Sequence, residues 1–265
     1  MPASALRPAF SRRLRTPRAV MALMLREMVT TYGRSPGGYL WAILDPVGAI
    51  ALLSFIFSQV FHAPALGSSF PLFYATGYLP FMMFNDVANK TATTIRFSKP
   101  LLQYPAVTFL DAILARFLLN GLTHIVVFFI VVIGLQLILG VITSIHFPAI
   151  VLAMAMALAL ALGIGTLNCY LVTRFPVWER IWQIATRPLF IISGVFFLYD
   201  SLPENIRSIM WFNPLAHVIG EMRRGFYATY EASYVSHVYV FSIALVAFVS
   251  GLALLYRHHR DLLNN

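Results

Sequence analysis

Long apolar blocks alternate with short polar gaps along the 265 residues of the chain. A helix that spans a membrane needs about 20 mostly apolar residues. Five blocks meet or approach that length, and the second is short and interrupted by Gly77 and Pro80. The pattern predicts an all-α integral membrane protein with six transmembrane helices, near Tyr39–Phe61, Phe70–Val87, Phe117–Leu139, Phe147–Val172, Ile181–Tyr199 and His237–Tyr256.

Basic residues collect in alternate gaps, whereas the gaps His62–Ser69 and Gly140–His146 contain no Lys, Arg, Asp or Glu. Short loops rich in Lys and Arg stay in the cytoplasm. We therefore predict a cytoplasmic tail at residues 1–38, one membrane domain at 39–256 and a second cytoplasmic tail at 257–265. The basic residues on that side are Arg7, Arg12, Arg13, Arg15, Arg18, Arg26, Arg34, Lys90, Arg96, Lys99, Arg174, Arg180, Arg257 and Arg260.

Composition supports the membrane assignment, since 59% of the residues are hydrophobic and 11% are charged. The net charge of the chain is +9. Most of its basic residues lie on the predicted cytoplasmic side, where they would face anionic lipid. Because no basic patch is interleaved with aromatic residues, we expect no nucleic-acid partner. The single cysteine, Cys169, excludes a disulfide within the chain and lies in an apolar block.

The segment before the first block combines arginines with an apolar run, Ala19–Leu25. It favours an amphipathic helix at the inner membrane surface, although a cleaved presequence is an alternative. The expected orientation places Arg18 and Arg26 toward the head groups, and the residues expected to face lipid are Val20, Leu23, Met24 and Met28.

Some polar residues intrude into the predicted spans. Asp45, followed by Pro46, lies about a turn inside the first span and should face protein, water or head groups. Arg116, Asn120 and His124 are spaced by four and share one helical face.

A second polar stripe contains Arg180, Gln183 and Arg187. Together with Arg116 it could form a cationic mouth at the cytoplasmic ends of the helices. The alternative is that Arg116 and Arg187 extend to the membrane surface or pair with an acid, the candidates being Asp45, Asp86 and Asp111.

The fourth block carries small residues at every fourth position: Ala153, Ala157, Ala161 and Gly165. That spacing lets two helices approach closely in a membrane, so we expect a packing face there.

The segment Asp200–Ser236 mixes apolar runs with charges. Pro203 and Pro214 suit the first turns of helices, and Asn213 suits an N-cap. We predict two short re-entrant helices between spans five and six, because backbone at membrane depth is tolerated where protein covers it. A plain amphipathic outer loop is the alternative.

Motifs of catalysis and nucleotide binding are absent from the sequence. The only lysines, Lys90 and Lys99, do not follow a glycine as in GxxxxGK[ST], so the chain should not bind ATP through a phosphate loop. It also lacks GxSxG, HExxH and a cysteine pair. We expect no catalytic residue, no metal site and no cofactor bound by this chain. Asp45 alone weakly supports an ion-coupled carrier.

Three segments carry a family resemblance: Gly38–Pro46, the Phe70–Phe81 region and Trp211–Val218. They resemble the membrane permease of type-two ABC exporters, above all the branch that exports capsular polysaccharide and next the O-antigen permeases. The resemblance runs from about Arg26 to the C-terminus.

The resemblance implies the six-span fold with an interface helix and two re-entrant helices, placed in a bacterial inner membrane. It implies a homodimer on two ATPase subunits, which would hold ATP and Mg, with periplasmic and outer-membrane export proteins as further partners. A lipid-anchored anionic glycan would pass outward through a channel at the dimer interface.

The resemblance also implies roles for particular residues. The gap at about Asn89–Gln103, closed by Pro100 and Pro105, would be the coupling helix that docks on the ATPase. Its contacts would be Lys90, Ile95, Arg96, Phe97, Ser98, Lys99, Leu101 and Leu102.

Candidates for the substrate path combine the polar stripes with flat aromatic faces on which sugars stack. They are Arg116, Asn120, His124, Arg187, Asp45, Tyr39, Trp41, Tyr74 and Tyr78. The candidates in the outer segment are Asn213, Pro214, His217, Arg223 and Arg224.

Other functions stay open on the sequence. An O-antigen or teichoic-acid-type permease differs only in the glycan. An ion-coupled carrier of a small solute belongs to another class and would need Asp45. A membrane-embedded enzyme would need a cluster of catalytic groups, which the sequence does not offer.

Overall fold

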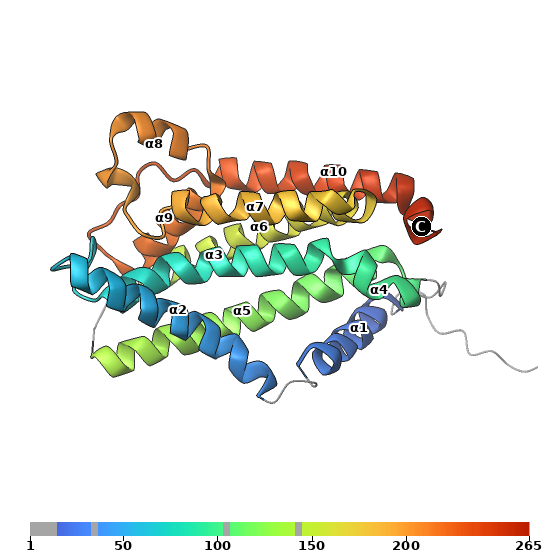
Figure 1. Ribbon diagram of the computed structural model, residues 1–265, viewed down its shortest axis with the longest axis horizontal. Coiled ribbons are helices and arrows are strands. Elements are labelled where there is room, and N and C mark those ends of the chain that lie inside the picture. The colour runs from blue at the N-terminus through green and yellow to red at the C-terminus, as the bar shows by residue number, and fades with distance from the viewer. Residues whose placement is uncertain (1–14, 33–36, 103–106, 141–144, 265) are drawn as a thin grey trace, which may run out of the picture.

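The structure is a computed structural model that describes residues 15–32, 37–102, 107–140 and 145–264. The described residues form a helical bundle (Figure 1). Arg7, Arg12, Arg13, Arg34, Gln103 and Pro105, named above, lie outside the described residues. The elements are α1 (Arg15–Tyr32), α2 (Gly38–Val60), α3 (Phe70–Ala92), α4 (Thr94–Leu102), α5 (Phe109–Leu139), α6 (Phe147–Arg174), α7 (Pro176–Ile192), η2 (Tyr199–Ser201), α8 (Glu204–Met210), α9 (Pro214–Phe226) and α10 (His237–Asn264).

Four helices in the described part of the chain are long and apolar enough to cross a membrane: α2, α5, α6 and the His237–His258 part of α10. The sequence predicts six. α7 has 17 residues, which is at the lower end of the length of a crossing. α3 has 23 residues but carries polar side chains along its second half, including Asn85, Asp86 and Asn89.

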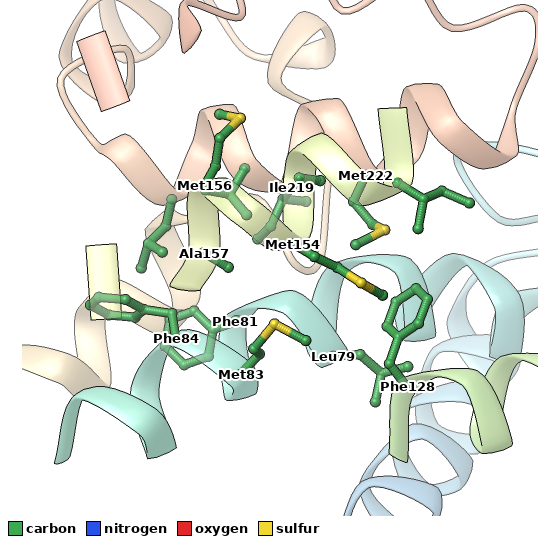
Figure 2. Packing of buried hydrophobic residues seen from close by; sticks show 14 of the residues in the cluster. Leu79, Phe81, Met83, Phe84, Phe128, Met154, Met156, Ala157, Ile219 and Met222 are labelled. Atoms are coloured by element: carbon green, nitrogen blue, oxygen red, sulfur yellow. The ribbon is translucent and has the colours of Figure 1, made fainter. Parts of the chain in front are cut away.

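The position of α3 explains its polar composition. It packs against α2, α5, α6 and α9, and most of its residues from Leu72 to Ala92 are buried. Figure 2 shows its side chains, among them Phe81 and Phe84, packed with Phe128 of α5, Met156 of α6 and Met222 of α9. Because protein surrounds α3, its polar groups find partners instead of lipid.

Local signals in the sequence set several helix starts. Ser69 caps α3 by accepting a hydrogen bond from the Leu72 backbone. Thr108 and Asp111 form a capping box that starts α5 at Phe109, well before the predicted start at Phe117. α8 follows Pro203 and α9 begins at Pro214. The presence of two short helices in the segment Asp200–Ser236 is therefore confirmed, and their re-entry into the membrane stays a prediction.

The helix formed by the fifth apolar block, α7, ends earlier than predicted. α7 stops at Ile192, and Gly194 adopts a φ of 85°, a left-handed conformation that glycine tolerates. The chain then turns, and Phe196 packs on Phe57 and Phe190 with ring centroids 5.7 and 5.1 Å away. The last residues of the block therefore cover the bundle instead of extending the helix.

The small-residue face of α6 serves packing, as predicted. Ala153, Ala157 and Ala161 are fully buried, and a Cβ at Gly165 would lie 2.8 Å from the Cβ of Thr91 on α3. The neighbouring face of α6 meets α10 equally closely, since a Cβ at Gly163 would lie 2.2 Å from the Ala244 carbonyl oxygen. Close backbone approach therefore joins α6 to both neighbours.

Gly163→Ala should destabilise the protein by about 1–3 kcal/mol, because the new methyl group meets the backbone of α10. Gly134→Ala is the matched control, since a Cβ there meets nothing within 4 Å and alanine favours a helix. Thermal unfolding of the two purified variants tests this, and equal midpoints would contradict the packing argument.

Candidate functional site

The predicted coupling segment lies at the end of the bundle that also holds α1 and the C-terminal end of α10 (Figure 1). The structure divides the segment in two. Asn89 and Lys90 belong to the last turns of α3, and Thr93 separates them from the short helix α4. The separate helix is therefore Thr94–Leu102.

The two faces of α4 have different surroundings. Ile95 is buried against Ile113, Cys169 and Leu255, and Leu102 packs on the same cluster. Thr94 and Ser98 are buried as well, whereas Arg96 and Pro100 are exposed. Phe97, Lys99 and Leu101 are half-buried. The exposed and half-buried residues are those that a partner can reach without unfolding α4.

Arg96 ties α4 to the helices on one side. Its guanidinium forms an ion pair with Glu179 of α7, with 2.5 Å between Nη1 and Oε2. Its Nη2 also donates to the Val172 carbonyl of α6 at 2.6 Å. The start of α7 is fixed further by Trp178, which donates to Asn168, and by Trp182, which donates to Asn89 of α3.

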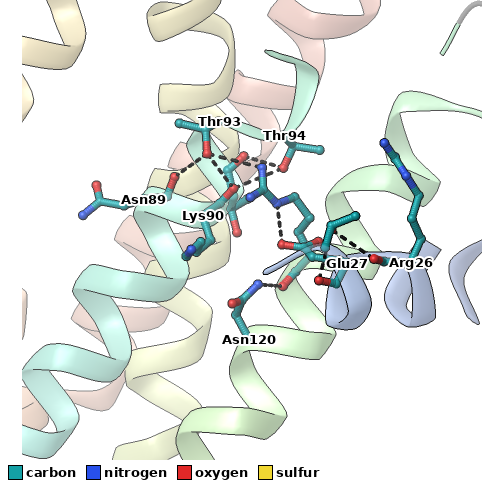
Figure 3. Close-up of polar contacts among 10 residues, drawn as sticks. Arg26, Glu27, Asn89, Lys90, Thr93, Thr94 and Asn120 are labelled. Atoms are coloured by element: carbon teal, nitrogen blue, oxygen red, sulfur yellow. Dashed lines mark hydrogen bonds and ion pairs between the residues drawn. The ribbon is translucent and has the colours of Figure 1, made fainter. Parts of the chain in front are cut away.

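Arg116 ties α4 to the helices on the other side. Its Nε donates to Glu27 Oε1 of α1 at 2.9 Å, and both side chains are almost fully buried, at 6% and 4% exposure. Nη1 donates to Thr93 at 3.3 Å, and the guanidinium lies 4.3 Å from the centroid of the Phe97 ring. Figure 3 shows this polar cluster, with Glu27 and Arg26 reaching from α1 toward the junction of α3 and α4.

These contacts settle the surroundings of the predicted basic stripes. The partner of Arg116 is Glu27, not Asp45, Asp86 or Asp111. Arg187 is exposed on α7, whereas Arg116 is buried.

The orientation expected for α1 is wrong at Val20, which is buried at 8% exposure. The ion pair between Glu27 and Arg116 turns one face of α1 toward the protein. Val20 lies on that face, two helical turns before Glu27. The exposed apolar residues of α1 are instead Met21, Leu25 and Val29.

A polar cavity of about 220 Å³ lies between α2, α3 and α5. Within it, His124 Nε2 lies 3.4 Å from Asp86 Oδ2. We call it the seam cavity, and its main polar and aromatic lining residues are Trp41, Asp45, Tyr78, Asp86, Lys90, Asn120, Thr123 and His124.

Five of the predicted path residues line the seam cavity: Trp41, Asp45, Tyr78, Asn120 and His124. Tyr39 is exposed near the start of α2, and Tyr74 is buried in the core at 2% exposure. Asp86 and Lys90 of α3 complete the cavity. Their spacing of four residues, which places them on one helical face, is the signal that could have identified Asp86.

The outer segment is held by Arg223 of α9, which is only 2% exposed. It donates to the carbonyls of Phe197 and Val195 at 2.8 and 3.0 Å, and lies 4.3 Å from the centroid of the Phe73 ring. Arg223 therefore fixes the turn that follows α7 against α3 and α9.

Two other predicted outer residues also make structural contacts. Arg224 pairs at 2.8 Å with the buried carboxylate of Glu221, which also contacts His237 at 3.1 Å. His217 accepts from the Ser236 backbone through Nδ1, so its Nε2 carries the proton and donates to the Trp211 carbonyl. Burial lowers the pKa of His217, which keeps this ring neutral.

Asn213 and Pro214 start α9. The Asn213 side chain accepts from the Leu215 backbone at 3.0 Å, as its predicted N-cap role requires, and donates to Ser193.

Tyr230, in the same outer segment, has a pKa raised by burial to about 12. It therefore remains a neutral phenol, which donates to Tyr234.

The family model for ABC-2 type transporters matches residues 18–227. The chain belongs to the ABC-2 type transporter family.

Its relatives include named export permeases. The polysialic acid transport protein KpsM of Escherichia coli is 32% identical over 235 residues, which cover 89% of this chain and 91% of that protein. The capsule polysaccharide export inner-membrane protein CtrC of Neisseria meningitidis is 28% identical, with 91% of each chain covered. The O-antigen export system permease protein RfbA of Klebsiella pneumoniae is 23% identical, covering 86% of this chain and 87% of RfbA.

In the described residues, no group of three or more His, Cys, Asp or Glu side chains is placed to hold a metal ion. The contacts of Arg96 and Phe97 link α4 to α1, α5, α6 and α7 at one end of the bundle. Glu27 and Glu179, which complete these links, were missed by the sequence analysis, although each is an isolated acid among basic residues.

Arg116→Ala should destabilise the protein by about 3–5 kcal/mol, because it leaves the Glu27 carboxylate buried without a partner. The double variant Glu27→Leu/Arg116→Met should recover most of that loss, since it removes both charges and keeps the volume. Thermal unfolding of the single and double variants tests the pair. A double variant as unstable as Arg116→Ala would mean that the pairing of the charges is not what matters.

Proposed function

We propose that this chain is the permease subunit of an ATP-driven exporter that moves a lipid-anchored anionic capsular polysaccharide across the bacterial inner membrane. Membership of the ABC-2 family supports transport. The similarity to KpsM and CtrC across nine-tenths of their length supports polysaccharide as the cargo. The weaker similarity to RfbA favours capsule over O antigen.

The observation that carries this proposal is the linkage of α4 to the rest of the bundle. Arg96 connects it to α6 and α7, while Phe97 receives the guanidinium groups of Arg116 from α5 and Arg26 from α1. A short helix with an exposed face and contacts to four helices is suited to transmit the motion of a partner to the bundle.

The ATPase partner would hold ATP and Mg and dock against the exposed and half-buried side of α4, at Arg96, Phe97, Lys99 and Leu101. Ile95, Ser98 and Leu102 would anchor α4 within the permease rather than contact the partner. When ATP binding closes the ATPase pair, a displaced α4 would move α1, α5 and α6 with it, because the buried contacts at Arg116–Glu27 and around Ile95 resist separation.

In the membrane we place α3 and α7 as the two further crossings beside the four apolar helices. α3 needs no apolar exterior because the bundle covers it. The ends of α4 and α10 share one side in Figure 1, and the basic loops assign that side to the cytoplasm. α8 and α9 would enter the outer leaflet and return.

The substrate path would run between two copies of the chain. α2 and α7 leave large apolar residues exposed, among them Leu52 and Phe55 on α2 and Ile184 on α7, as expected of helices that pack on a second copy. Arg187, Tyr39 and Trp41 are exposed and could contact the glycan. Arg116 and Tyr74 are enclosed within one copy and would act through packing. Periplasmic and outer-membrane export proteins would receive the glycan near α8.

An ion-coupled carrier is the second candidate, because the seam cavity holds Asp45 and Asp86. The two functions differ in energy source. We expect vesicles containing the permease and its ATPase to export glycan only with ATP, and the purified permease alone to hydrolyse none. Transport driven by an ion gradient without the ATPase, and abolished by Asp45→Asn, would contradict the exporter.

The coupling role of α4 predicts that Arg96→Glu with Lys99→Glu weakens association with the ATPase by about tenfold or more, because it replaces the two cationic side chains that α4 offers to the partner with anions. Glu179→Gln is the control: it breaks the ion pair of Arg96 within the chain but leaves the exposed side of α4 unchanged. A pull-down of the ATPase measures both. Equal recovery with the charge-reversal variant would exclude this surface as the docking site.

A further inference from the structure

An apolar groove lies next to the seam cavity along α2 and α5, and Pro71 of α3 also lines it. Its volume is about 200 Å³. The seam cavity is lined by residues from the stretches 38–46 of α2 and 120–127 of α5. The groove is lined by residues from the neighbouring stretches 43–51 of α2 and 130–138 of α5. We call it the seam groove, and its lining residues are Ile43, Val47, Ile50, Ala51, Pro71, Ile130, Val131, Gly134, Leu135 and Ile138.

The seam groove has the shape and polarity for a hydrocarbon chain. The residues named as its lining are all apolar, and a Cβ at Gly134 would meet nothing within 4 Å. Its α5 portion covers about 12 Å at the rise of a helix. Ile130 and Ile138 are exposed beside it, at 46% and 83%, so the groove opens toward the bilayer, where lipid tails would enter it.

Tail insertion alone does not select a lipid. The tail leaves one apolar environment for another, so only van der Waals packing favours it. Selection must come from the polar end, and the seam cavity lies directly beside the groove on α2 and α5. An amphiphile with its head in the cavity and its tail in the groove satisfies both parts.

The charges of the seam cavity indicate which head group fits. Asp45 and Asp86 provide negative charge, Lys90 provides positive charge, and His124 contacts Asp86. A purely anionic head group would meet both carboxylates. A head group with a phosphate and a primary ammonium can place the phosphate near Lys90 and the ammonium near Asp45, which is exposed within the cavity.

We propose that the seam between α2 and α5 binds one phospholipid with a zwitterionic, primary-ammonium head group, such as phosphatidylethanolamine. The head occupies the seam cavity and one acyl chain occupies the seam groove. Trp41 and Tyr78 then line the head-group site. This inference does not rest on the exporter function, because it follows from the two adjoining cavities.

The test is competition among lipids of equal chain length. The full-length protein, delipidated in mild detergent, is mixed with equal amounts of phosphatidylethanolamine, phosphatidylglycerol and phosphatidylcholine, and bound lipid is identified by native mass spectrometry. We expect one phosphatidylethanolamine molecule to be retained preferentially. Phosphatidylcholine has an ammonium without hydrogen atoms on its nitrogen, so it tests whether hydrogen bonding from the ammonium is needed. Phosphatidylglycerol has no ammonium, so it tests whether the positive charge is needed.

Two variants fill the groove: Gly134→Leu and Ala51→Phe. Each should abolish retention of that lipid whatever its head group, and the use of two guards against one failing to fold. Gly48→Leu is the matched control, because Gly48 lies on α2 outside the groove lining and a Cβ there meets nothing within 4 Å. Retention in both groove variants equal to that in Gly48→Leu would overturn the proposed site.

One variant changes the head-group site. Asp45→Asn should lower the preference for phosphatidylethanolamine over phosphatidylglycerol about fivefold, the factor that a solvent-accessible ion pair provides at most, and leave tail binding intact. Equal retention of the three lipids by the original protein, or a preference for phosphatidylglycerol, would overturn the proposed head group. An unchanged preference in Asp45→Asn would exclude the carboxylate as its ammonium contact.

Discussion

Polar side chains within this bundle are tolerated only where other parts of the protein cover them, and much of the architecture follows from that constraint. A charge facing lipid is expensive, so Arg116 requires Glu27, and Glu27 requires α1 to lie against α5. Arg223 likewise requires the carbonyls of the turn after α7. At both ends of the bundle, a buried arginine holds an element that would otherwise be free to move.

The same constraint places α3 at the centre. A helix with Asn85, Asp86, Asn89 and Lys90 cannot present all its faces to lipid, and α2, α5, α6 and α9 cover it. Close approach by small residues makes the cover possible, because Gly163, Gly165 and Gly251 bring α6 against α10 and α3. Within this cover, Asp86 and Lys90 of α3 line the seam cavity, and Asn89 accepts a hydrogen bond from Trp182.

The arrangement couples the surface to the interior at the α4 end. A buried ion pair contributes little net stability, since desolvation offsets much of the attraction. Removing only one of its two partners is costly, because the other charge is then left buried without a partner. That asymmetry holds α1, the junction at Thr93 and α5 together, because Arg116 contacts both Glu27 and Thr93. The exposed Arg96–Glu179 pair contributes less to stability, because solvent screens it.

The sequence by itself determined the membrane class, the approximate position of each apolar helix, the starts of α8 and α9, the packing face of α6 and the family resemblance. Such features depend on composition, period and local capping, which act over a few residues. Only the tertiary structure decided the partner of Arg116, the inward face of α1, the reversal after Ile192 and the adjoining seam cavity and groove. Each depends on contacts between residues far apart in the chain, such as Glu27 with Arg116, and no local pattern specifies which of several acids an arginine will meet.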